Sequence, residues 1–276
     1  MRKFKIINAD GLEFDLMRKD AFFNLPTGLG FSISDESFST GFGWIETESE
    51  LEQGVISGEM VILNYSVYSE FSKFCAKEPL VFCYAPAGSW FFRDCKISKL
   101  DKGDIDEKTH RLVCPIDLLC YSVWYDNKWV FKATTAENDG KTYNYKYPYV
   151  YSETTAGAVT LLNTGAIQSP CRIHVQGVVV NPKWALTVNG VVTQRGEINI
   201  TIPNGNKLLV DSTAQSMEIA EYTHNNEFVR NLYQYSDFST SRFIFAPPGT
   251  SVLSFSHEGI NEIQVYVEVK EYAAAV

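Results

Sequence analysis

The sequence lacks the features of a membrane-spanning, secreted or nucleic-acid-binding protein. No stretch approaches the roughly 18 apolar residues that a membrane-spanning helix requires, and only Ile6 and Ile7 are consecutive apolar residues near the N-terminus, so no signal peptide is expected. Basic residues are in the minority, because 24 Lys and Arg face 33 Asp and Glu for a net charge of −9. The largest basic clusters, residues 1–5 and 17–19, are short. We therefore expect a soluble protein made in a cytoplasm, with no membrane insertion and no specific nucleic-acid binding.

Patterns that carry catalysis or metal binding are missing as well. None of the six cysteines forms a Cys-x-x-Cys pair, so we expect reduced, buried thiols. The four histidines are far apart, and none lies in a zinc-ligand motif. There is no Gly-x-Ser-x-Gly motif, and Gly28-Leu29-Gly30 is followed neither by a third glycine nor by a helical pattern. The sequence predicts no enzyme, no catalytic residue, no metal site and no cofactor.

What the chain has in abundance is material for hydrophobic cores. Its 276 residues are 45% hydrophobic and 14% aromatic, which is too much for a disordered chain and is enough for two domains of ordinary size. The polar, turn-rich segment 134–146 is the expected boundary. We therefore predict a mainly β protein with domains 1–135 and 136–276. Residues 147–276 are expected to fold alone, unless the final strand, residues 263–269, pairs with the first domain.

Residues 170–211 show most clearly what the second domain is. Cys171, Ile173 and Val175 alternate with polar residues, which is the period of a half-buried strand. Asn189-Gly190 is a strong hairpin signal because both turn positions need positive φ. Further strands are expected over residues 198–202 and 207–211. Four short strands need a second sheet to cover their apolar face, so the stretch predicts a β-sandwich.

The first domain combines strands with one helix. Phe4 and Ile6, then Leu12, Phe14 and Leu16, alternate on either side of the hairpin dipeptide Asp10-Gly11. From residue 66 the apolar period changes to that of a helix, with Asn64 or Ser66 as the cap and Pro79 beyond its end. The helix is predicted over residues 66–77.

Residues 31–58 form a segment that is too long and too aromatic for an ordinary connector. It holds glycines, serines and acidic residues, and no basic residue interrupts it. As a folded-back hairpin, its 28 or so residues would reach roughly 45 Å. Buried aromatic residues dominate interface energies. We therefore predict an arm that contacts a neighbouring subunit through Phe38, Phe42, Trp44 and Ile45; the alternative is a disordered or self-packed loop.

The succession of motifs along the chain resembles the distal tail protein (Dit) family of long-tailed, non-contractile phages. The motifs that carry the resemblance are Met17-Arg18-Lys19-Asp20, Pro26-x-Gly28-x-Gly30-Phe31, Gly58-Glu59-Met60-Val61, Tyr65-x-x-Tyr68-x-x-Phe71-x-x-Phe74, residues 165–170 and 173–177, Val180-Asn181-Pro182, Gly190, residues 196–202 and 208–211, Asn231-Leu232-Tyr233 and residues 243–249.

The resemblance implies an N-terminal ring-forming β-domain and a C-terminal galectin-like β-sandwich. It also implies a virion structural protein of the baseplate. This protein would form a homohexameric ring at the tail tip that joins the tail tube protein to the tail-associated protein and, through receptor-binding proteins, to host adhesion. The sugar-binding residues of true galectins are not matched, since Val179 and Lys183 stand where the pattern has His and Arg. A carbohydrate-binding, lectin-like host-recognition protein using Trp184, Tyr233 or Tyr235 is the alternative function. A hydrolase acting on cell-wall polymers is a third.

Overall fold

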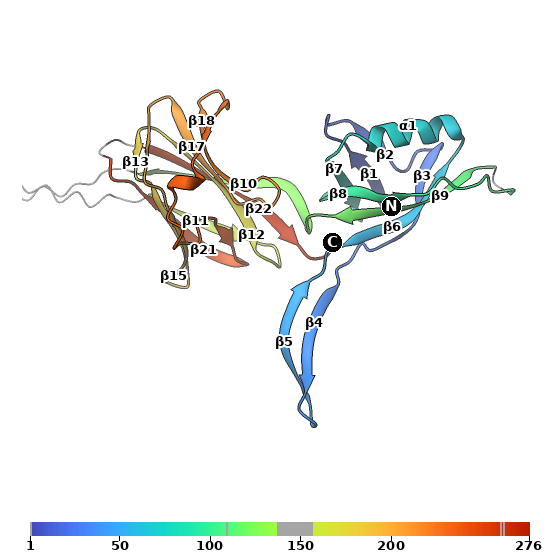
Figure 1. Ribbon diagram of the computed structural model, residues 1–276, viewed down its shortest axis with the longest axis horizontal. Coiled ribbons are helices and arrows are strands. Elements are labelled where there is room, and N and C mark those ends of the chain that lie inside the picture. The colour runs from blue at the N-terminus through green and yellow to red at the C-terminus, as the bar shows by residue number, and fades with distance from the viewer. Residues whose placement is uncertain (1, 109, 137–156, 260, 262) are drawn as a thin grey trace, which may run out of the picture. The chain divides into compact units, whose positions relative to one another are not determined.

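The computed structural model describes residues 2–108, 110–136, 157–259, 261 and 263–276 (Figure 1). The chain is mainly β with one α-helix among the described residues, and it divides into two compact units. Unit 1 is Met1–Asn127 with Ala273–Val276, and unit 2 is Lys128–Tyr272. The predicted fold class of two β-rich domains with one helix is confirmed. The two units meet in the chain at Asn127, ahead of the expected boundary at residue 135, and residues 137–146 of the expected boundary segment lie outside the described residues.

Unit 1 is built on one run of antiparallel strands in the order β2–β1–β7–β8–β9–β6–β3, and strand β10 also pairs with β8. A bridge between Met17 and Phe22 joins the two ends of this order. The strands are β1 (Lys3–Ile7), β2 (Glu13–Asp15), β3 (Ala21–Thr27), β6 (Val55–Ile62), β7 (Leu80–Ala85), β8 (Phe91–Leu100), β9 (Leu112–Cys120) and β10 (Trp124–Ala136).

The alternation predicted for the first residues is present in unit 1. Phe4, Ile6, Phe14 and Leu16 are all buried, whereas Leu12 is exposed at the turn between β1 and β2. Phe4 stacks on Tyr84, with ring centroids 5.1 Å apart and planes 12° apart. Apolar residues from nearly every strand meet in this core. The two-residue alternation thus correctly predicted that Phe4, Ile6, Phe14 and Leu16 face inward, and Leu12 is the exception.

Helix α1 (Tyr65–Cys75) covers this core and lies within two residues of the predicted bounds. Asn64 caps it, because its side-chain Oδ1 accepts from the backbone N of Ser66 at 3.0 Å and of Val67 at 3.1 Å. The buried residues Phe71 and Cys75 lie one turn apart and face the core. None of the helices in the part of the chain described here is long and apolar enough to span a membrane.

Unit 2 is a β-sandwich of two main antiparallel sheets. One has the order β19–β18–β17–β12–β22–β10, and the other has the order β11–β21–β14–β15. Two short strands, β13 and β16, pair with each other, and β20 pairs with β12. The strands are β11 (Gly157–Asn163), β12 (Ser169–Gln176), β13 (Val179–Val180), β14 (Lys183–Val188), β15 (Val191–Glu197), β16 (Thr201–Ile202), β17 (Asn206–Asp211), β18 (Glu218–Thr223), β19 (Phe228–Asn231), β20 (Phe245–Ala246), β21 (Gly249–Ser256) and β22 (Ile263–Ala273); a 3-10 turn, η1 (Tyr233–Tyr235), follows β19.

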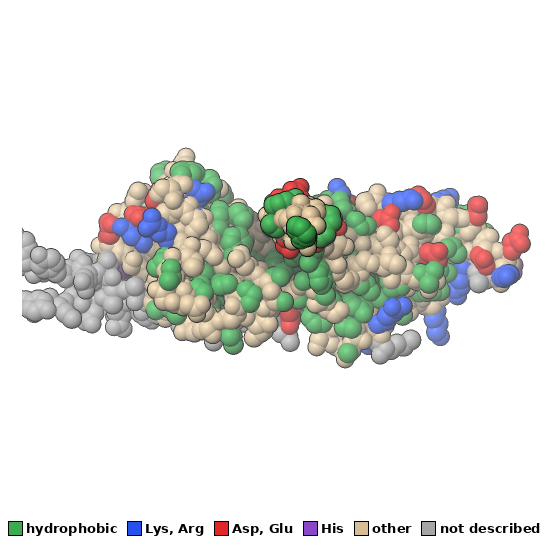
Figure 2. All heavy atoms as spheres, turned by 90° about the horizontal axis from the view of Figure 1, so that it is seen from below, with side chains coloured by type: hydrophobic (Ala, Val, Ile, Leu, Met, Phe, Trp, Pro, Cys, Tyr) green, Lys and Arg blue, Asp and Glu red, His purple; other side chains and the backbone are tan. Residues whose placement is uncertain are grey.

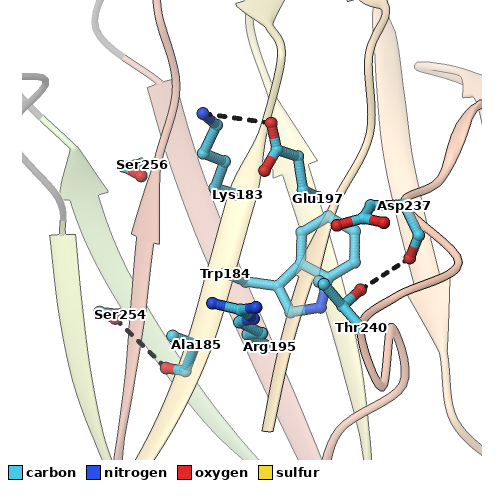
Figure 3. Close-up of a pocket in the computed structure, with 10 residues that line it drawn as sticks. Lys183, Trp184, Ala185, Arg195, Glu197, Asp237, Thr240, Ser254 and Ser256 are labelled. Carbon is cyan, nitrogen blue, oxygen red and sulfur yellow. Dashed lines mark hydrogen bonds and ion pairs between the residues drawn. The ribbon is translucent and has the colours of Figure 1, made fainter. Parts of the chain in front are cut away.

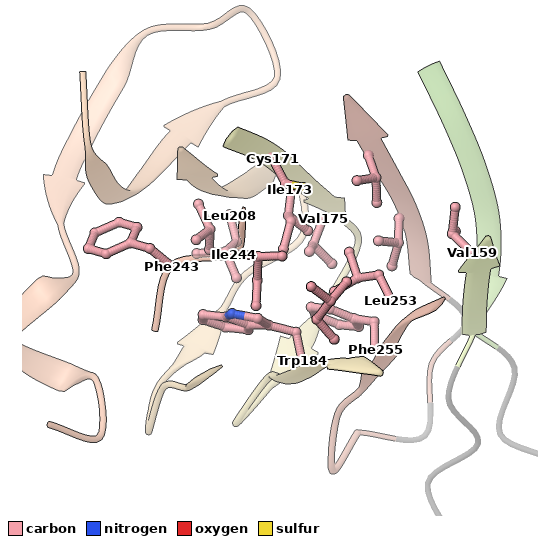
Figure 4. Packing of buried hydrophobic residues seen from close by; sticks show 14 of the residues in the cluster. Val159, Cys171, Ile173, Val175, Trp184, Leu208, Phe243, Ile244, Leu253 and Phe255 are labelled. Atoms are coloured by element: carbon pink, nitrogen blue, oxygen red, sulfur yellow. The ribbon is translucent and has the colours of Figure 1, made fainter. Parts of the chain in front are cut away.

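The core of unit 2 lies between these sheets (Figure 4). Ile173 and Val175 of β12 face Trp184 of β14 and Phe255 of β21 across it, and the Trp184 and Phe255 rings stack with centroids 6.5 Å apart. The Asn189-Gly190 turn joins β14 to β15 with φ of 50° and 80°, as the dipeptide predicts.

Residues 170–211 do not form one four-stranded sheet, however. β12 and β17 belong to one layer and β14 and β15 to the other, so this stretch supplies both faces of the sandwich core.

The last strand stays in unit 2. β22 pairs with β12 over its register from Cys171↔Val269 to Gln176↔Gln264. Only Ala273–Val276 belong to unit 1, where Ala273 and Val276 pack against the core. The alternative that residues 263–269 pair with the first domain is therefore not what the structure shows.

Candidate assembly interface: the β4–β5 arm

Two strands of unit 1 stand apart from its sheet. β4 (Ile33–Ser39) and β5 (Trp44–Leu51) pair only with each other and form a hairpin that projects from the unit (Figure 1). We refer to residues 33–51 as the arm. Every residue of both strands is exposed. A two-stranded hairpin without a covering layer is only marginally stable in water. The arm therefore has the form of an element that is completed by something outside its own unit.

The four residues predicted as interface anchors lie together at the outer end of the arm. Phe38 is paired with Ile45, Trp44 is paired with Ser39, and Phe42 lies in the turn between the strands. The exposed fraction is 105% for Phe42 and 76% for Trp44, and Phe38 and Ile45 are about half exposed. In Figure 2, where the arm points toward the viewer, hydrophobic side chains occupy its end and acidic side chains lie at its sides. Contiguous apolar side chains on a surface mark interaction sites more often than isolated ones do. Contact with a neighbour remains a prediction.

The root of the arm, in contrast, is tightly fixed to unit 1. On the incoming side, Gly28 has a φ of 75°, and a Cβ added there would lie 1.9 Å from the carbonyl oxygen of Val55. Trp124 is fully buried, and its Nε1 donates to the carbonyl oxygen of Leu29 at 3.0 Å. On the outgoing side, the backbone N of Cys120 donates to the carbonyl oxygen of Gly54 at 2.9 Å. Both strands of the arm thus leave from backbone that is held in place.

A buried arginine closes this root. Arg93 is only 4% exposed, its guanidinium lies over the Trp124 ring at 5.6 Å, and its Nε donates to the carbonyl oxygen of Ser122 at 2.8 Å. A Cβ on Gly54 would lie 2.0 Å from its Nη2, so only glycine leaves room for this guanidinium. We refer to Gly54, Arg93 and Trp124 as the root cluster. The sequence analysis did not predict the root cluster. The only sequence features that could have indicated it are the glycines on either side of the arm, Gly28 and Gly54.

A polar concavity of unit 2 that Trp184 helps to line bears on the lectin-like alternative (Figure 3). It has a volume of about 290 Å³ and lies against β14, β15 and β21. Lys183 forms ion pairs there with Glu197 at 3.1 Å and Glu258 at 3.4 Å. Trp184 forms part of the wall, but its side chain is buried and its Nε1 donates to the carbonyl oxygen of Arg242 at 2.7 Å. A buried indole offers no face on which a sugar ring could stack.

The other aromatic residues named for sugar binding have neighbours of their own. Tyr233 packs edge-on against Phe238, with centroids 5.4 Å apart, and the guanidinium of Arg242 lies 5.2 Å from its ring centre. Tyr233 and Tyr235 each keep somewhat over a third of their surface exposed. Val179, where galectins carry a histidine, is fully buried. The described residues thus do not assemble a sugar-binding groove around the predicted aromatics.

The thiols and other titratable groups give no indication of catalysis among the described residues. All six cysteines are free and buried, and burial raises the pKa of Cys75, Cys83 and Cys171 to about 12, which leaves no thiolate near neutral pH. No group of three or more His, Cys, Asp or Glu side chains gathers into a metal-binding arrangement in the described parts of the chain.

Comparisons with known proteins show which family and which fold the chain resembles. Residues 3–121 match the family model described as the distal tail protein, N-terminal domain. A chain of the phage p2 baseplate, in its activated conformation with Sr, superposes with a TM-score of 0.66 at 14% identity, covering 100% of both chains. The SPP1 Dit protein, described as a paradigm of hub adsorption apparatus in Gram-positive infecting phages, superposes with a TM-score of 0.62 at 11% identity, covering 97% of this chain and 98% of that one. No curated protein gives a significant match.

The family match confirms the resemblance found in the sequence, and the superpositions extend the shared fold over the whole chain. The matched residues 3–121 include the arm, helix α1, and Gly54 and Arg93 of the root cluster, whereas Trp124 lies just beyond them. The arm therefore lies within the part of the chain that matches the family model.

Proposed function

We propose that this chain, a phage distal tail protein by its N-terminal domain and its fold, assembles as a six-membered ring at the tail tip and joins the tail tube protein to the tail-associated and host-adhesion proteins. The observation that carries this proposal is the arm: a fixed root, two strands exposed on both faces, and a cluster of aromatic side chains at the outer end. The protein acts as a structural hub of the virion and not as an enzyme.

The shape of the arm fits a ring better than a two-fold dimer. A ring closes through head-to-tail contacts, in which one surface of each copy meets a different surface of the next. A projecting hairpin on one side of unit 1 supplies such a one-sided surface. Phe42 and Trp44 would bury most of their exposed area on docking, and large aromatic anchors of this kind carry most of the binding free energy in interfaces. The four apolar residues at the end of the arm therefore offer a surface that could bind the next copy in the ring.

Replacing Phe42 and Trp44 together by Ala tests the proposal. The double variant should fold, because neither side chain contributes to the core of unit 1, and it should lose ring formation. Anchor residues contribute about 2 kcal/mol or more each, which is about thirtyfold in the dissociation constant. Mass photometry of the purified chain and micrographs of phage tails carrying the variant would measure the loss.

A matched control removes two exposed apolar side chains from unit 2, Val191 and Val192, by substitution with Ala. This variant should assemble like the parent. If the Phe42 and Trp44 variant assembles as well as the parent, the arm is not the clamp of the ring. The proposed six-membered ring fails if micrographs of the tail tip show three-fold or two-fold symmetry at the layer formed by this protein.

A further inference from the structure

We propose that one negatively charged face of the arm docks in a pocket on strands β1 and β2 of a second copy of this chain. The pocket carries basic residues and a tryptophan. This inference rests on the proposed ring, because it names the surface that receives the arm. It goes beyond the aromatic anchors at the tip by assigning a role to the charges along the strands.

The register of the hairpin sorts the side chains of the arm onto two faces. Residues directly opposite in an antiparallel pair point to the same face. Glu36 is opposite Glu48, and Ser34 is opposite Glu50. The register shifts between Glu36 and Ser37, but residues of β4 still alternate between the faces, so Phe38 lies on the same face as Glu36. The Phe38–Ile45 pair therefore lies on the face of these glutamates, one step nearer the tip. We call this set, Glu36, Glu48, Glu50, Phe38 and Ile45, the acidic face.

The charge of the acidic face has no compensation within the described part of the chain. The sequence contains no Lys, Arg or His from residue 20 to residue 72. None of the three glutamates forms an ion pair with a described residue, and two carboxylates directly opposite each other destabilise a hairpin. The arrangement therefore weakens the free arm and favours a cationic surface as its partner.

Unit 1 also carries a pocket with the complementary chemistry. It has a volume of about 450 Å³ and lies beside β1 and β2. Its lining has three basic residues (Arg2, Lys3 and Lys5), two acidic residues (Glu13 and Asp15), and Trp90 and Met17. Lys5 lies over the Trp90 ring at 4.8 Å and pairs with Glu13 at 2.6 Å. Arg2 lies over the Phe4 ring at 5.7 Å, and neither Arg2 nor Lys3 forms an ion pair with a described carboxylate. Three cations against two carboxylates leave the pocket with a net positive charge, and Arg2 and Lys3 are the cations left to meet the glutamates. Trp90 and Met17 offer apolar surface to Phe38 and Ile45.

The receiving pocket belongs to another copy and not to the same one. Every residue of β4 and β5 is exposed, so the arm does not rest on its own unit. The acidic face and the pocket are different surfaces of one chain. Contact between them on neighbouring copies is therefore head-to-tail, and such a contact can repeat around a ring. Because the matching charges are partly solvent-exposed, docking should weaken as the ionic strength rises.

Zero-length cross-linking tests the contact directly. A carbodiimide joins carboxylates only to amines that already touch them, so full-length protein at low ionic strength should yield Lys3 or Lys5 joined to Glu36, Glu48 or Glu50. An equal mixture of isotope-labelled and unlabelled protein shows by mass spectrometry whether the link runs between copies. The Lys5–Glu13 pair within one copy serves as an internal positive control. Absence of the links between copies, or arm glutamates linked only to other lysines, overturns the proposal.

Charge reversal supplies a matched pair of variants. Glu36→Lys with Glu48→Lys should raise the concentration needed for ring formation by about tenfold, taking a factor of a few for each exposed ion pair lost and more for the repulsion created. The control, Asp35→Lys with Glu46→Lys, makes the same change on the opposite face of the arm and should assemble like the parent. Adding Arg2→Glu and Lys3→Glu to the first variant should restore assembly.

The outcomes separate this inference from the ring itself. If the Phe42 and Trp44 variant loses assembly while both charge-reversal pairs assemble equally well, the ring stands and the docking site is wrong. If no arm variant changes assembly, the arm has no part in the ring, and both the docking site and the role of the aromatic anchors are wrong. If the parent protein itself forms no ring, the proposed function fails.

Discussion

At the scale of single residues, burial was easier to predict than the neighbours of a buried residue. Five of the cysteines lie on strands and Cys75 lies on helix α1, and all six are buried as expected. Trp184, however, was a candidate for stacking on a sugar, and the structure buries it. Its cross-strand partner in the register is Gly196, where a Cβ would lie 2.4 Å from the indole. Gly196 leaves space for the Trp184 indole. The pairing of these two residues depends on the register of β14 and β15, and the alternation of apolar residues alone does not determine that register.

His257 gives unit 2 a dependence of stability on pH. The residue is 4% exposed, its Nδ1 accepts from the backbone N of Gly259 at 3.1 Å, and burial lowers its pKa below the usual value. Between that lowered pKa and about 6.5, the unfolded chain binds a proton that the folded chain does not. The free energy of unfolding should therefore fall as the pH drops below about 6.5, and the loss should be complete once the pH is below the pKa of the folded state.

Substituting His257→Gln should flatten this dependence, as measured by urea unfolding between pH 5 and 7.5. The dependence that remains belongs partly to His174, whose pKa is also lowered by burial, with Glu268 opposing the shift. His224→Gln is the control, because that side chain is exposed. Equal pH dependence in the parent and in the His257 variant would contradict the assignment.

At the scale of elements, short sequence motifs correctly predicted the structures that depend on neighbouring residues in the chain, namely a helix and a hairpin. The Asn64 cap and the change of period gave the helix, and Asn189-Gly190 gave its hairpin. The strand expected over residues 198–202 is shorter, since only Thr201–Ile202 pair as a strand. Ile198 instead bridges to Ser236, so the chain changes partners part of the way along the apolar run. The root cluster was missed because its members come from separate places in the chain and meet only in the folded unit.

Gly54→Ala should loosen the root of the arm. The new Cβ would lie 2.0 Å from Nη2 of Arg93, so the guanidinium must leave its place over Trp124. Overpacking of this kind costs about 1–3 kcal/mol in the free energy of unfolding.

Gly43→Ala is the matched control in the same hairpin, because the nearest atom to its Cβ is Thr40 Oγ1 at 3.9 Å, and it should change stability by less than about 0.5 kcal/mol. Urea unfolding followed by tryptophan fluorescence measures both; equal stability of the two variants would mean that the root cluster does not hold the arm.

At the scale of the whole molecule, composition and motif order predicted two β-rich domains, but the way the chain passes between them was not visible. β10 begins in unit 1 at Trp124, and its residues from Lys128 onward belong to unit 2, where the strand lies next to β22. Ala273–Val276 then return to unit 1. Both crossings occur within strands, and a strand carries no turn or composition signal at the point where it changes units. The boundary predicted from polar, turn-rich sequence therefore lies after the point at which the chain passes from one compact unit to the other.

This path predicts which fragment of the chain folds alone. Residues 128–272 contain all of unit 2, including the neighbour of β22, and should unfold cooperatively. Residues 137–272 differ only by the loss of the β10 segment, which leaves one edge of β22 unpaired. Each lost backbone hydrogen bond costs about 1 kcal/mol, so the shorter fragment should be less stable by at least about 2 kcal/mol in urea unfolding followed by circular dichroism. The fragment 147–276, which the sequence suggested, lacks the same segment and should share the deficit. If 137–272 is as stable as 128–272, the β10 segment is not an integral strand of the sandwich, and the sequence-based boundary would be the better division of the chain.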